Sequence, residues 1–104
     1  MSLRYENDTV ICHHLKDEYS INADDIKSVE LGENVKELKL VRNFGFGTIT
    51  IQKGDFTVDG KGGYTVFLWM ETGNYIKFVT DNDVYYINGA SEAETAEVYK
   101  NIKR

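Results

Sequence analysis

Residues 64–104 read YTVFLWMETGNYIKFVTDNDVYYINGASEAETAEVYKNIKR. This stretch decides the fold, because its pattern predicts three short strands followed by a single helix. Polar turns at 71–74 and 81–83 separate the strands, and the sheet is expected to end at 88–90. We therefore expect a β-meander that is closed by one C-terminal helix.

The first of these strands carries apolar side chains on both faces, because Val66 and Leu68 alternate with Phe67 and Trp69. Such a strand is either covered on both sides or bears an outward aromatic patch. In the two strands that follow, one face is expected to be inward and to pair across the hairpin. Its residues are Ile76, Phe78, Tyr85 and Ile87.

The helix is expected to begin at Ser91 and to run to Arg104. Ser91-Glu92-Ala93-Glu94 matches a capping box, in which Ser91 caps the backbone N–H of Glu94 and Glu94 reaches back. Four residues at helical spacing form a stripe that must pack on the sheet. They are Thr95, Val98, Tyr99 and Ile102. We expect this helix to close one open end or corner of a strongly bent sheet.

The N-terminal half also reads as β structure. Strands are expected at 9–13 and 19–22, joined as a hairpin by a polar turn, and a third strand at 27–31. Residues 22–26 indicate a turn or one helical turn between them. The segment 35–41 fits either a strand or a helix, and the alternation around Leu38 and Leu40 favours a strand.

Glycines punctuate the middle of the chain at positions 45, 47, 54 and 60, with strands expected between them at 48–51 and 56–58. Glycine at such points supplies positive φ in turns, or a bulge where a small barrel bends sharply. A phosphate-binding loop would need a glycine-rich turn that feeds a helix. Here the glycines feed strands, and no Gly-Lys-Ser/Thr sequence occurs.

Length and composition bound the class of protein. The 104 residues fit one domain, and 41% hydrophobic residues indicate a globular chain. A net charge of −5 disfavours binding to nucleic acid or to anionic lipid. The single cysteine, Cys12, cannot form an internal disulfide, which favours a reducing, cytoplasmic location. No signal peptide opens the chain, and no apolar run reaches the ~20 residues that span a bilayer.

The domain is expected to occupy residues 9–104, preceded by a leader at 1–8. Met1-Ser2-Leu3 has the look of residues added for expression, in which case the natural protein extends further toward its N-terminus.

The order of strands, glycines and helix carries a resemblance to a known family. The segments that carry it are 19–21, 26–31, 42–47, 54–60, 76–80 and 84–88, which lead into the helix. From Val10 onward the chain resembles the bacterial pleckstrin-homology-like (PH-like) domains. The resemblance implies a mainly β fold, a bent antiparallel seven-stranded barrel or sandwich closed by one C-terminal α-helix.

The same resemblance implies a non-enzymatic interaction or assembly module that binds protein partners or itself, since some relatives form homo-oligomeric rings. Members often follow membrane-spanning helices, so a membrane tether outside this chain and a place at the cytoplasmic face of the membrane are expected possibilities. Eukaryotic relatives bind phosphoinositides through a basic loop between the first two strands. Here that loop, 14–18, holds Lys16 beside Asp17 and Glu18, so phosphoinositide binding is not expected.

The side chains that could act as nucleophiles, bases or metal ligands are explained better by structural roles than by catalysis. Cys12, His13 and His14 are adjacent donors, but on a strand His13 projects to the face opposite the other two, so they cannot converge on a metal. The carboxylates at 24–25, 55, 59, 81 and 83 are expected in turns, which Asp stabilises. No nucleophile–base set can be assembled. We expect no enzyme activity, no metal and no cofactor.

The best candidate contact surface consists of Arg42, Phe44, Phe46 and Trp69, because arginine beside aromatic residues is typical of interface hot spots. Alternatively, Phe44 and Phe46 flank a turn and cap the core.

Two functions stay open. One is the interaction module, which would offer an exposed strand edge to a partner. The other is a carrier or sensor that holds a small apolar ligand inside a β-barrel. A core filled by large side chains would exclude the second function. The residues expected to fill it are Phe56, Leu68, Phe78, Ile87 and Ile102.

Overall fold

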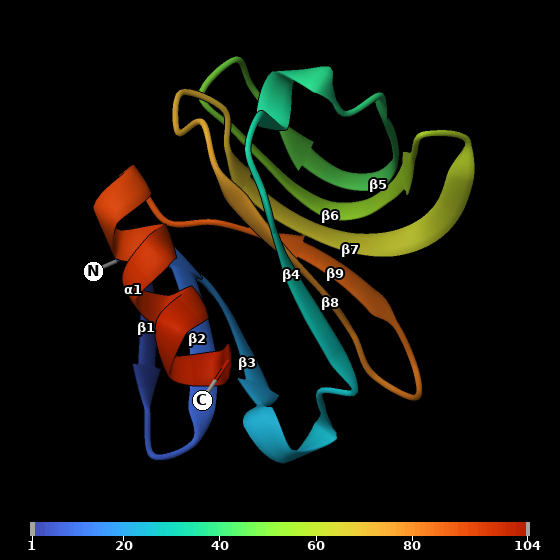
Figure 1. Ribbon diagram of the computed structural model, residues 1–104. Helices are drawn as coiled ribbons and strands as arrows, with labels where there is room; N and C mark the ends of the chain where they lie inside the picture. Colours follow the sequence, from blue (N-terminus) through green and yellow to red (C-terminus); the bar gives the residue numbers. More distant parts are fainter. Residues whose placement is uncertain (1, 104) are drawn as a thin grey trace.

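A computed structural model gives the structure of the protein and describes residues 2–103. Within this range nine β-strands form two sheets, with one α-helix beside them (Figure 1). The first sheet is antiparallel in the order β1-β2-β3 and contains β1 (Leu3–Glu6), β2 (Thr9–His14) and β3 (Asp17–Asn22). The hairpin predicted between the second and third of these strands is confirmed.

The second sheet has six strands in the order β4-β8-β9-β7-β6-β5. Its members are β4 (Ser28–Gly32), β5 (Leu40–Gly47), β6 (Ile51–Val58), β7 (Lys61–Trp69), β8 (Tyr75–Val79) and β9 (Val84–Ile87). The fold is therefore mainly β, as the sequence predicts. Strands β4 and β5 are the two edges of this sheet.

The expected seven-stranded barrel is not confirmed, because the strands of residues 2–103 form two sheets and close no barrel. The 3₁₀ turn η1 (Ala23–Asp25) separates the sheets along the chain. Asn22 Oδ1 accepts a hydrogen bond from the N–H of Asp24 at 2.9 Å, which caps this turn. The chain then enters β4, which pairs with β8 and not with β3.

Strand β1 lies within residues 1–8, which were expected to form a leader that precedes the domain. It pairs with β2 in the register Leu3↔Cys12 to Glu6↔Thr9, and the side chain of Leu3 is fully buried. Four residues with only two apolar side chains give a weak strand signal. The pairing with β2 makes this segment a strand.

The meander expected at 64–88 is wrong in its order. Strand β9 lies between β8 and β7 and runs parallel to β7, with Thr65↔Tyr85 and Phe67↔Ile87 in register. The connection 70–74 therefore passes over one strand position. The predicted pairing across the β8–β9 hairpin is confirmed, because Ile76 lies opposite Ile87 and Phe78 opposite Tyr85.

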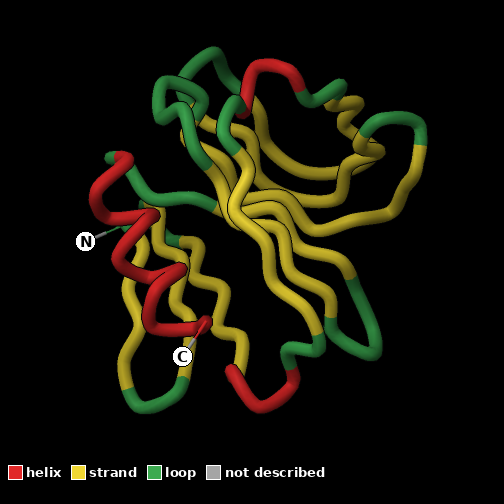
Figure 2. The backbone as a smooth tube through the Cα atoms, viewed as in Figure 1, coloured by secondary structure: helices red, strands yellow, loops and turns green. Residues whose placement is uncertain are grey.

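The glycines at 45 and 54 lie inside strands and do not break them. Gly45 and Gly54 are paired across β5 and β6 with φ angles of 135° and 130°. A Cβ on Gly45 would lie 2.5 Å from the carbonyl oxygen of Lys53, and one on Gly54 would lie 2.5 Å from that of Phe44. Both positions need glycine, and they let β5 and β6 curve strongly (Figure 2).

The expected strands 48–51 and 35–41 are wrong over most of their length for local reasons, although Ile51 begins β6 and Leu40 begins β5. Residues 48–50 form the hairpin loop between β5 and β6, in which Thr48 Oγ1 accepts the N–H groups of Thr50 and Ile51. Residues Val35–Glu37 form a second 3₁₀ turn, η2, capped by the side chain of Asn34. In both cases a side-chain oxygen satisfies backbone donors that a strand would pair with a neighbour.

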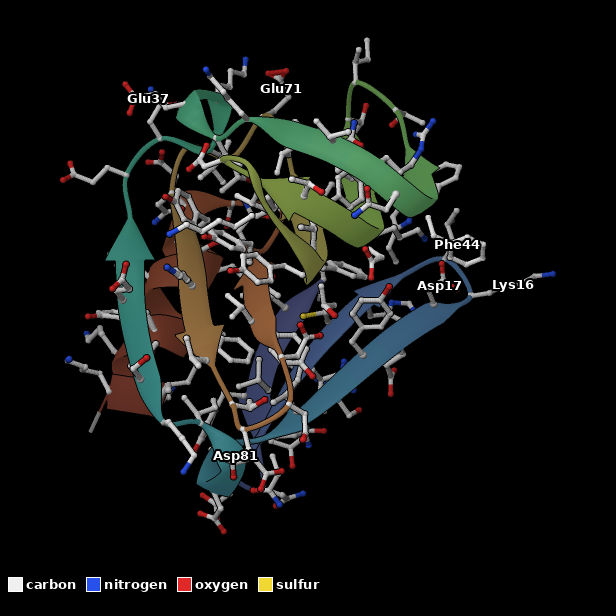
Figure 3. The ribbon with its side chains drawn as sticks, turned by 90° about the vertical axis from the view of Figure 1, so that its right-hand side faces the viewer. Lys16, Asp17, Glu37, Phe44, Glu71 and Asp81 are labelled. Atoms are coloured by element: carbon white, nitrogen blue, oxygen red, sulfur yellow. The ribbon has the colours of Figure 1, made fainter. Side chains whose placement is uncertain are left out.

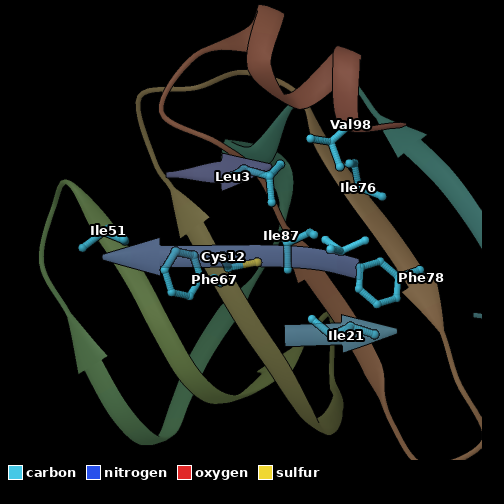
Figure 4. Close-up of a cluster of buried hydrophobic side chains, with 10 residues drawn as sticks. Leu3, Cys12, Ile21, Ile51, Phe67, Ile76, Phe78, Ile87 and Val98 are labelled. Atoms are coloured by element: carbon cyan, nitrogen blue, oxygen red, sulfur yellow. The ribbon is translucent and has the colours of Figure 1, made fainter. Parts of the chain in front are cut away.

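The core consists of two clusters on opposite faces of the six-stranded sheet. The first lies between the two sheets and α1 (Figure 4); its buried residues include Leu3, Val10, Cys12, Ile21, Ile51, Phe67, Ile76, Phe78, Ile87 and Val98. The second lies on the other face, with Val35, Phe56, Val58, Val66, Leu68 and Tyr86. Strand β7 is thus covered on both sides, which confirms one of the two expectations for its alternating pattern.

Helix α1 (Glu92–Lys103) packs against β1, β4 and β8. Ser91 Oγ accepts the N–H of Glu94 at 3.1 Å, as the capping box predicts. The carboxylate of Glu94 does not reach back to Ser91. Its Oε1 accepts the N–H of Ala90 at 3.1 Å, the N–H of Leu3 at 3.2 Å and the hydroxyl of Ser2 at 2.5 Å. The first turn of the helix therefore holds the start of β1.

Candidate interaction surface

Lys53 joins the two sheets through polar contacts. It lies on β6 on the same face as buried Ile51, and only 5% of its surface is exposed. Its Nζ lies 2.8 Å from Asp17 Oδ2 and 2.7 Å from His14 Nδ1, and it donates to the carbonyl oxygen of His14 at 3.3 Å. The ammonium also lies 5.2 Å from the centroid of the Phe46 ring. A buried lysine needs such partners, because an unpaired charge in the interior is costly.

These contacts indicate how Lys53, His14 and Asp17 are protonated. An ammonium has no acceptor, so His14 Nδ1 accepts from Lys53 and the imidazole is neutral. Burial lowers the pKa of His14, the charge of Lys53 lowers it further, and the charge of Asp17 raises it. The hydrogen bond from Lys53, and then its charge, lower the pKa of Asp17. Lys53 therefore forms an ion pair with Asp17 and donates a hydrogen bond to a neutral His14.

The segment 14–18, expected between the first two strands, lies at the tip of the β2–β3 hairpin between the second and third strands, because β1 precedes it. The tip residues are Leu15 and Lys16, and Leu15 has a positive φ of 56° and is 73% exposed. Asp17, which follows them, is engaged by Lys53. Figure 3 shows Lys16 pointing away from the hairpin into solvent. A single free ammonium is a poor site for a phosphorylated headgroup.

The four residues predicted to form a contact surface do not share one face. Phe44 pairs with Asp55 and Phe46 pairs with Lys53, so both project to the same face of the sheet. Arg42 pairs with Phe56, the neighbour of Asp55 on β6, and so it projects to the opposite face. The β-bulge between Arg42 and Phe44 causes this separation, because it adds one residue and reverses the alternation.

Trp69 lies on the face of Phe46 but contributes to the core. It pairs with Ile51, and its ring packs against the first core cluster. The ring of His14 lies between the two aromatics, 5.2 Å from Trp69 and 6.4 Å from Phe46 between centroids. The indole Nε1 is buried and has no hydrogen-bond partner within residues 2–103. Trp69 therefore supports the surface from beneath.

The exposed part of this face is apolar and lies at the sheet edge. All six residues of 41–46 are exposed, and the exposed fractions are 60% for Val41, 81% for Phe44 and 45% for Phe46. We call Val41, Phe44, Phe46 and Leu15 the β5 surface. A hollow of about 530 Å³ lies beside Phe46, lined by Leu15, Lys16, Asp17 and Lys53. Figure 3 labels Phe44 at the end of the molecule where the hairpin tip lies.

Outside the β5 surface, the side chains that could act as nucleophiles or metal ligands have structural partners. Cys12 is fully buried in the first core cluster, and this burial raises the pKa of its thiol far above the ordinary value. In the turn at 80–83, Thr80 Oγ1 accepts the N–H groups of Asn82 and Asp83, and Asp81 pairs with Lys27 at 3.2 Å. Asp55 lies inside β6, not in a turn as predicted, and accepts a hydrogen bond from Asn43.

No three His, Cys, Asp or Glu side chains in the range 2–103 are arranged to hold a metal ion. Over the same range no helix has the length and hydrophobicity needed to cross a bilayer.

Val41 and Leu15 of the β5 surface, and Lys53 beneath it, are not among the contact residues predicted from sequence. Lys53 lies two residues after Ile51 and therefore on the same inward face of β6. This position was the signal that could have found it. The sequence places Leu15 in a polar turn, and a single exposed leucine does not by itself indicate a binding surface. Leu15 and Lys53 lie beside Phe46 because the hairpin β2–β3 and the strand β6 meet there, which is a tertiary relationship.

No curated protein and no solved structure matches the chain at a significant level. A sequence model described as "Bacterial PH domain" matches residues 1–100. This match covers almost all of the chain, including β1. The mainly β fold, the glycine-bent strands and the closing helix agree with it. The protein therefore belongs to the bacterial PH domain family.

Proposed function

We propose that this domain is a non-enzymatic interaction module that binds an extended protein segment along β5. The single observation that carries the proposal is the exposure of this edge strand, in which residues 41–46 are all exposed and include an 81% exposed Phe44. An unpaired edge offers backbone donors and acceptors to an incoming strand, and apolar side chains beside it select the sequence. Within the described residues β5 pairs with β6 alone.

The charges near β5 favour a protein segment over a phosphate-bearing ligand. Lys53 is buried and already paired with Asp17, so its charge is not free for a ligand. Lys16 is the remaining cation of the hairpin tip, and the whole chain carries a net charge of −5. Clustered, unpaired cations are what phosphoinositide and nucleic-acid binding require.

The alternative function, an apolar ligand held inside a barrel, has less support. The interior positions that such a ligand would need are occupied by side chains of the chain itself. Phe56, Leu68, Phe78 and Ile87 are buried, and Ile102 packs against the first cluster. These residues belong to two separate clusters on opposite faces of one sheet. A single central cavity is not expected in such an arrangement.

Selection of binders from a random peptide library tests the proposal. The bait is the whole chain, and each selected peptide is re-measured against two variants. Phe44→Lys places a charge on the edge strand, and Ile49→Lys makes the same change at a 92% exposed residue of the β5–β6 loop. We expect peptides that lose roughly tenfold or more in affinity with Phe44→Lys and keep it with Ile49→Lys.

Amide hydrogen exchange on the peptide complex locates the contact. Protection is expected in 40–47, because strand addition satisfies the free backbone groups of β5. Peptides that bind both variants equally, or that protect another strand and leave β5 unchanged, would contradict the proposal.

A further inference from the structure

The centre of β5 has a sequence that reads the same in both directions: Phe44-Gly45-Phe46. Phe44 and Phe46 project to one face of the sheet, and Gly45 lies between them. We propose that β5 pairs with the β5 strand of a second copy of this chain, antiparallel and about a two-fold axis at Gly45. This inference rests on the proposed function, because it names the segment that the exposed edge takes up.

The two-fold axis at Gly45 gives each exposed ring a matching ring. In an antiparallel pair centred on one residue, the neighbours on either side face each other across the axis. Phe44 therefore faces the partner's Phe46, and Phe46 faces the partner's Phe44. Cross-strand aromatic pairs stabilise an antiparallel pair of strands, and the two equivalent pairs cover side chains that are 81% and 45% exposed in one copy.

The charges on the two neighbouring β6 strands do not oppose pairing about this axis. Asp55 lies beside Phe44 on β6, and Lys53 lies beside Phe46. Each row of side chains across the dimer therefore runs from Asp55 through Phe44 and the partner's Phe46 to the partner's Lys53. No like charges stand at the two ends of a row, so the arrangement adds no repulsion of its own.

Charge also distinguishes β5 from the other sheet edges. The edges among the described residues are β1, β3, β4 and β5. The first three carry acidic side chains, namely Glu6 in β1, Asp17 and Glu18 in β3, and Glu30 in β4. Strand β5 carries none. In a chain of net charge −5, it is the edge where two copies meet without placing carboxylates at the contact.

Sedimentation equilibrium of the whole chain tests the association over a range from about 1 µM to about 1 mM. We expect wild type and Ile49→Lys to show the same concentration-dependent dimer. Phe44→Lys should raise the dimer dissociation constant by roughly tenfold or more, because it replaces both equivalent ring pairs. A wild type that stays monomeric at the highest concentration overturns the inference. So does a Phe44→Lys variant that dimerises like wild type.

Disulfide crosslinking tests the register. The variants Phe44→Cys and Phe46→Cys are prepared separately and oxidised alone or mixed. In a mixed dimer the two introduced thiols face each other while the second ring pair stays intact. Facing Cβ atoms are about 4.5–5.5 Å apart, near the separation of about 3.5–4.5 Å in a disulfide. Native Cys12 is fully buried and does not compete.

We expect a crosslinked dimer from the mixture and little from either variant alone. Crosslinking that is equal in all three samples, or absent from the mixture, overturns the register.

The outcomes also separate this inference from the proposed function. A monomeric wild type that selects peptides in a Phe44-dependent way keeps the interaction module and overturns self-pairing. A dimer crosslinked as expected supports self-pairing even when no peptide is selected, since the partner strand then occupies β5.

Discussion

The side-chain amide of Asn88 pairs with the backbone of Trp69 as another strand residue would. Asn88 Oδ1 accepts the N–H of Trp69 at 2.6 Å, and Nδ2 donates to the carbonyl oxygen of Trp69 at 3.1 Å. Nδ2 also donates to the carbonyl oxygen of Asn74 at 3.1 Å, and Asn88 is fully buried. One side chain thus extends the parallel pairing of β7 and β9 and holds the connection that passes over β9.

Asn88→Ala should therefore destabilise the fold by about 2–4 kcal/mol, because it leaves the backbone N–H of Trp69 without a partner and removes the bond to the carbonyl oxygen of Asn74. Urea unfolding followed by circular dichroism measures the loss. Asn82→Ala, in the exposed turn before β9, is the matched control and should change the free energy of unfolding by less than about 0.5 kcal/mol. Equal effects of the two substitutions would contradict the role of Asn88.

Gly54→Ala should cost more stability than Gly60→Ala, because two effects add at Gly54. Both glycines have positive φ, 130° at Gly54 and 83° at Gly60, so alanine is strained at either. The Cβ at 54 would also lie 2.5 Å from the backbone oxygen of Phe44, whereas nothing lies within 4 Å at 60. We expect a loss of about 1 kcal/mol for Gly60→Ala and about 3 kcal/mol or more for Gly54→Ala in urea unfolding. Losses of the same size would show that the close approach of β5 and β6 is relaxed easily.

Stability should fall as the pH drops from about 6.5 through the folded-state pKa of His14. The pKa of His14 is lower in the folded chain, so the unfolded chain binds the proton first and is favoured. His14→Gln keeps an acceptor for Lys53 but does not titrate, and it should reduce the difference in urea midpoint between about pH 7 and about pH 5. His13→Gln, at an exposed position of β2, is the control and should reduce this difference less than His14→Gln does. A His14→Gln variant with the wild-type pH dependence would assign the effect to other groups.

Glu94→Ala should loosen β1 as well as the start of α1. One carboxylate oxygen of Glu94 accepts hydrogen bonds from Ser2, Leu3 and Ala90. We expect a loss of about 1–3 kcal/mol in the free energy of unfolding, with faster amide exchange in β1. Glu97→Ala, an exposed carboxylate one turn later, should leave both unchanged within about 0.5 kcal/mol. Unaltered exchange in β1 would mean that its pairing with β2 alone holds it.

Features of this fold that depend on neighbouring residues along the chain were predictable from the sequence. The Ser91 cap, the two covered faces of β7 and the cross-strand pairs of the β8–β9 hairpin follow from periodicity and capping chemistry. The order of strands in the sheet did not follow from periodicity or capping. Nothing in the periodicity of 64–88 distinguishes a meander from a sheet in which β9 lies beside β7, because both bury the same side chains.

The candidate surface was predictable only in part, for a related reason. Phe44 and Phe46 were identified as contact residues, and the structure leaves both exposed. Arg42 was grouped with them because residues two apart on a strand share a face, and the bulge at this position breaks that rule. A bulge depends on how two strands pair, so the sequence of one strand does not reveal it.

The ion pair of Lys53 with Asp17 has a consequence for the entropy of binding. Leu15 holds a left-handed backbone conformation, which is strained for a leucine, and it does so at a hairpin tip that Lys53 ties to β6. These contacts hold His14 and Asp17, the two residues that flank the tip, against β6. A partner bound as proposed would meet Leu15 and Phe46 beside these contacts, and less of its binding free energy would be spent on ordering them.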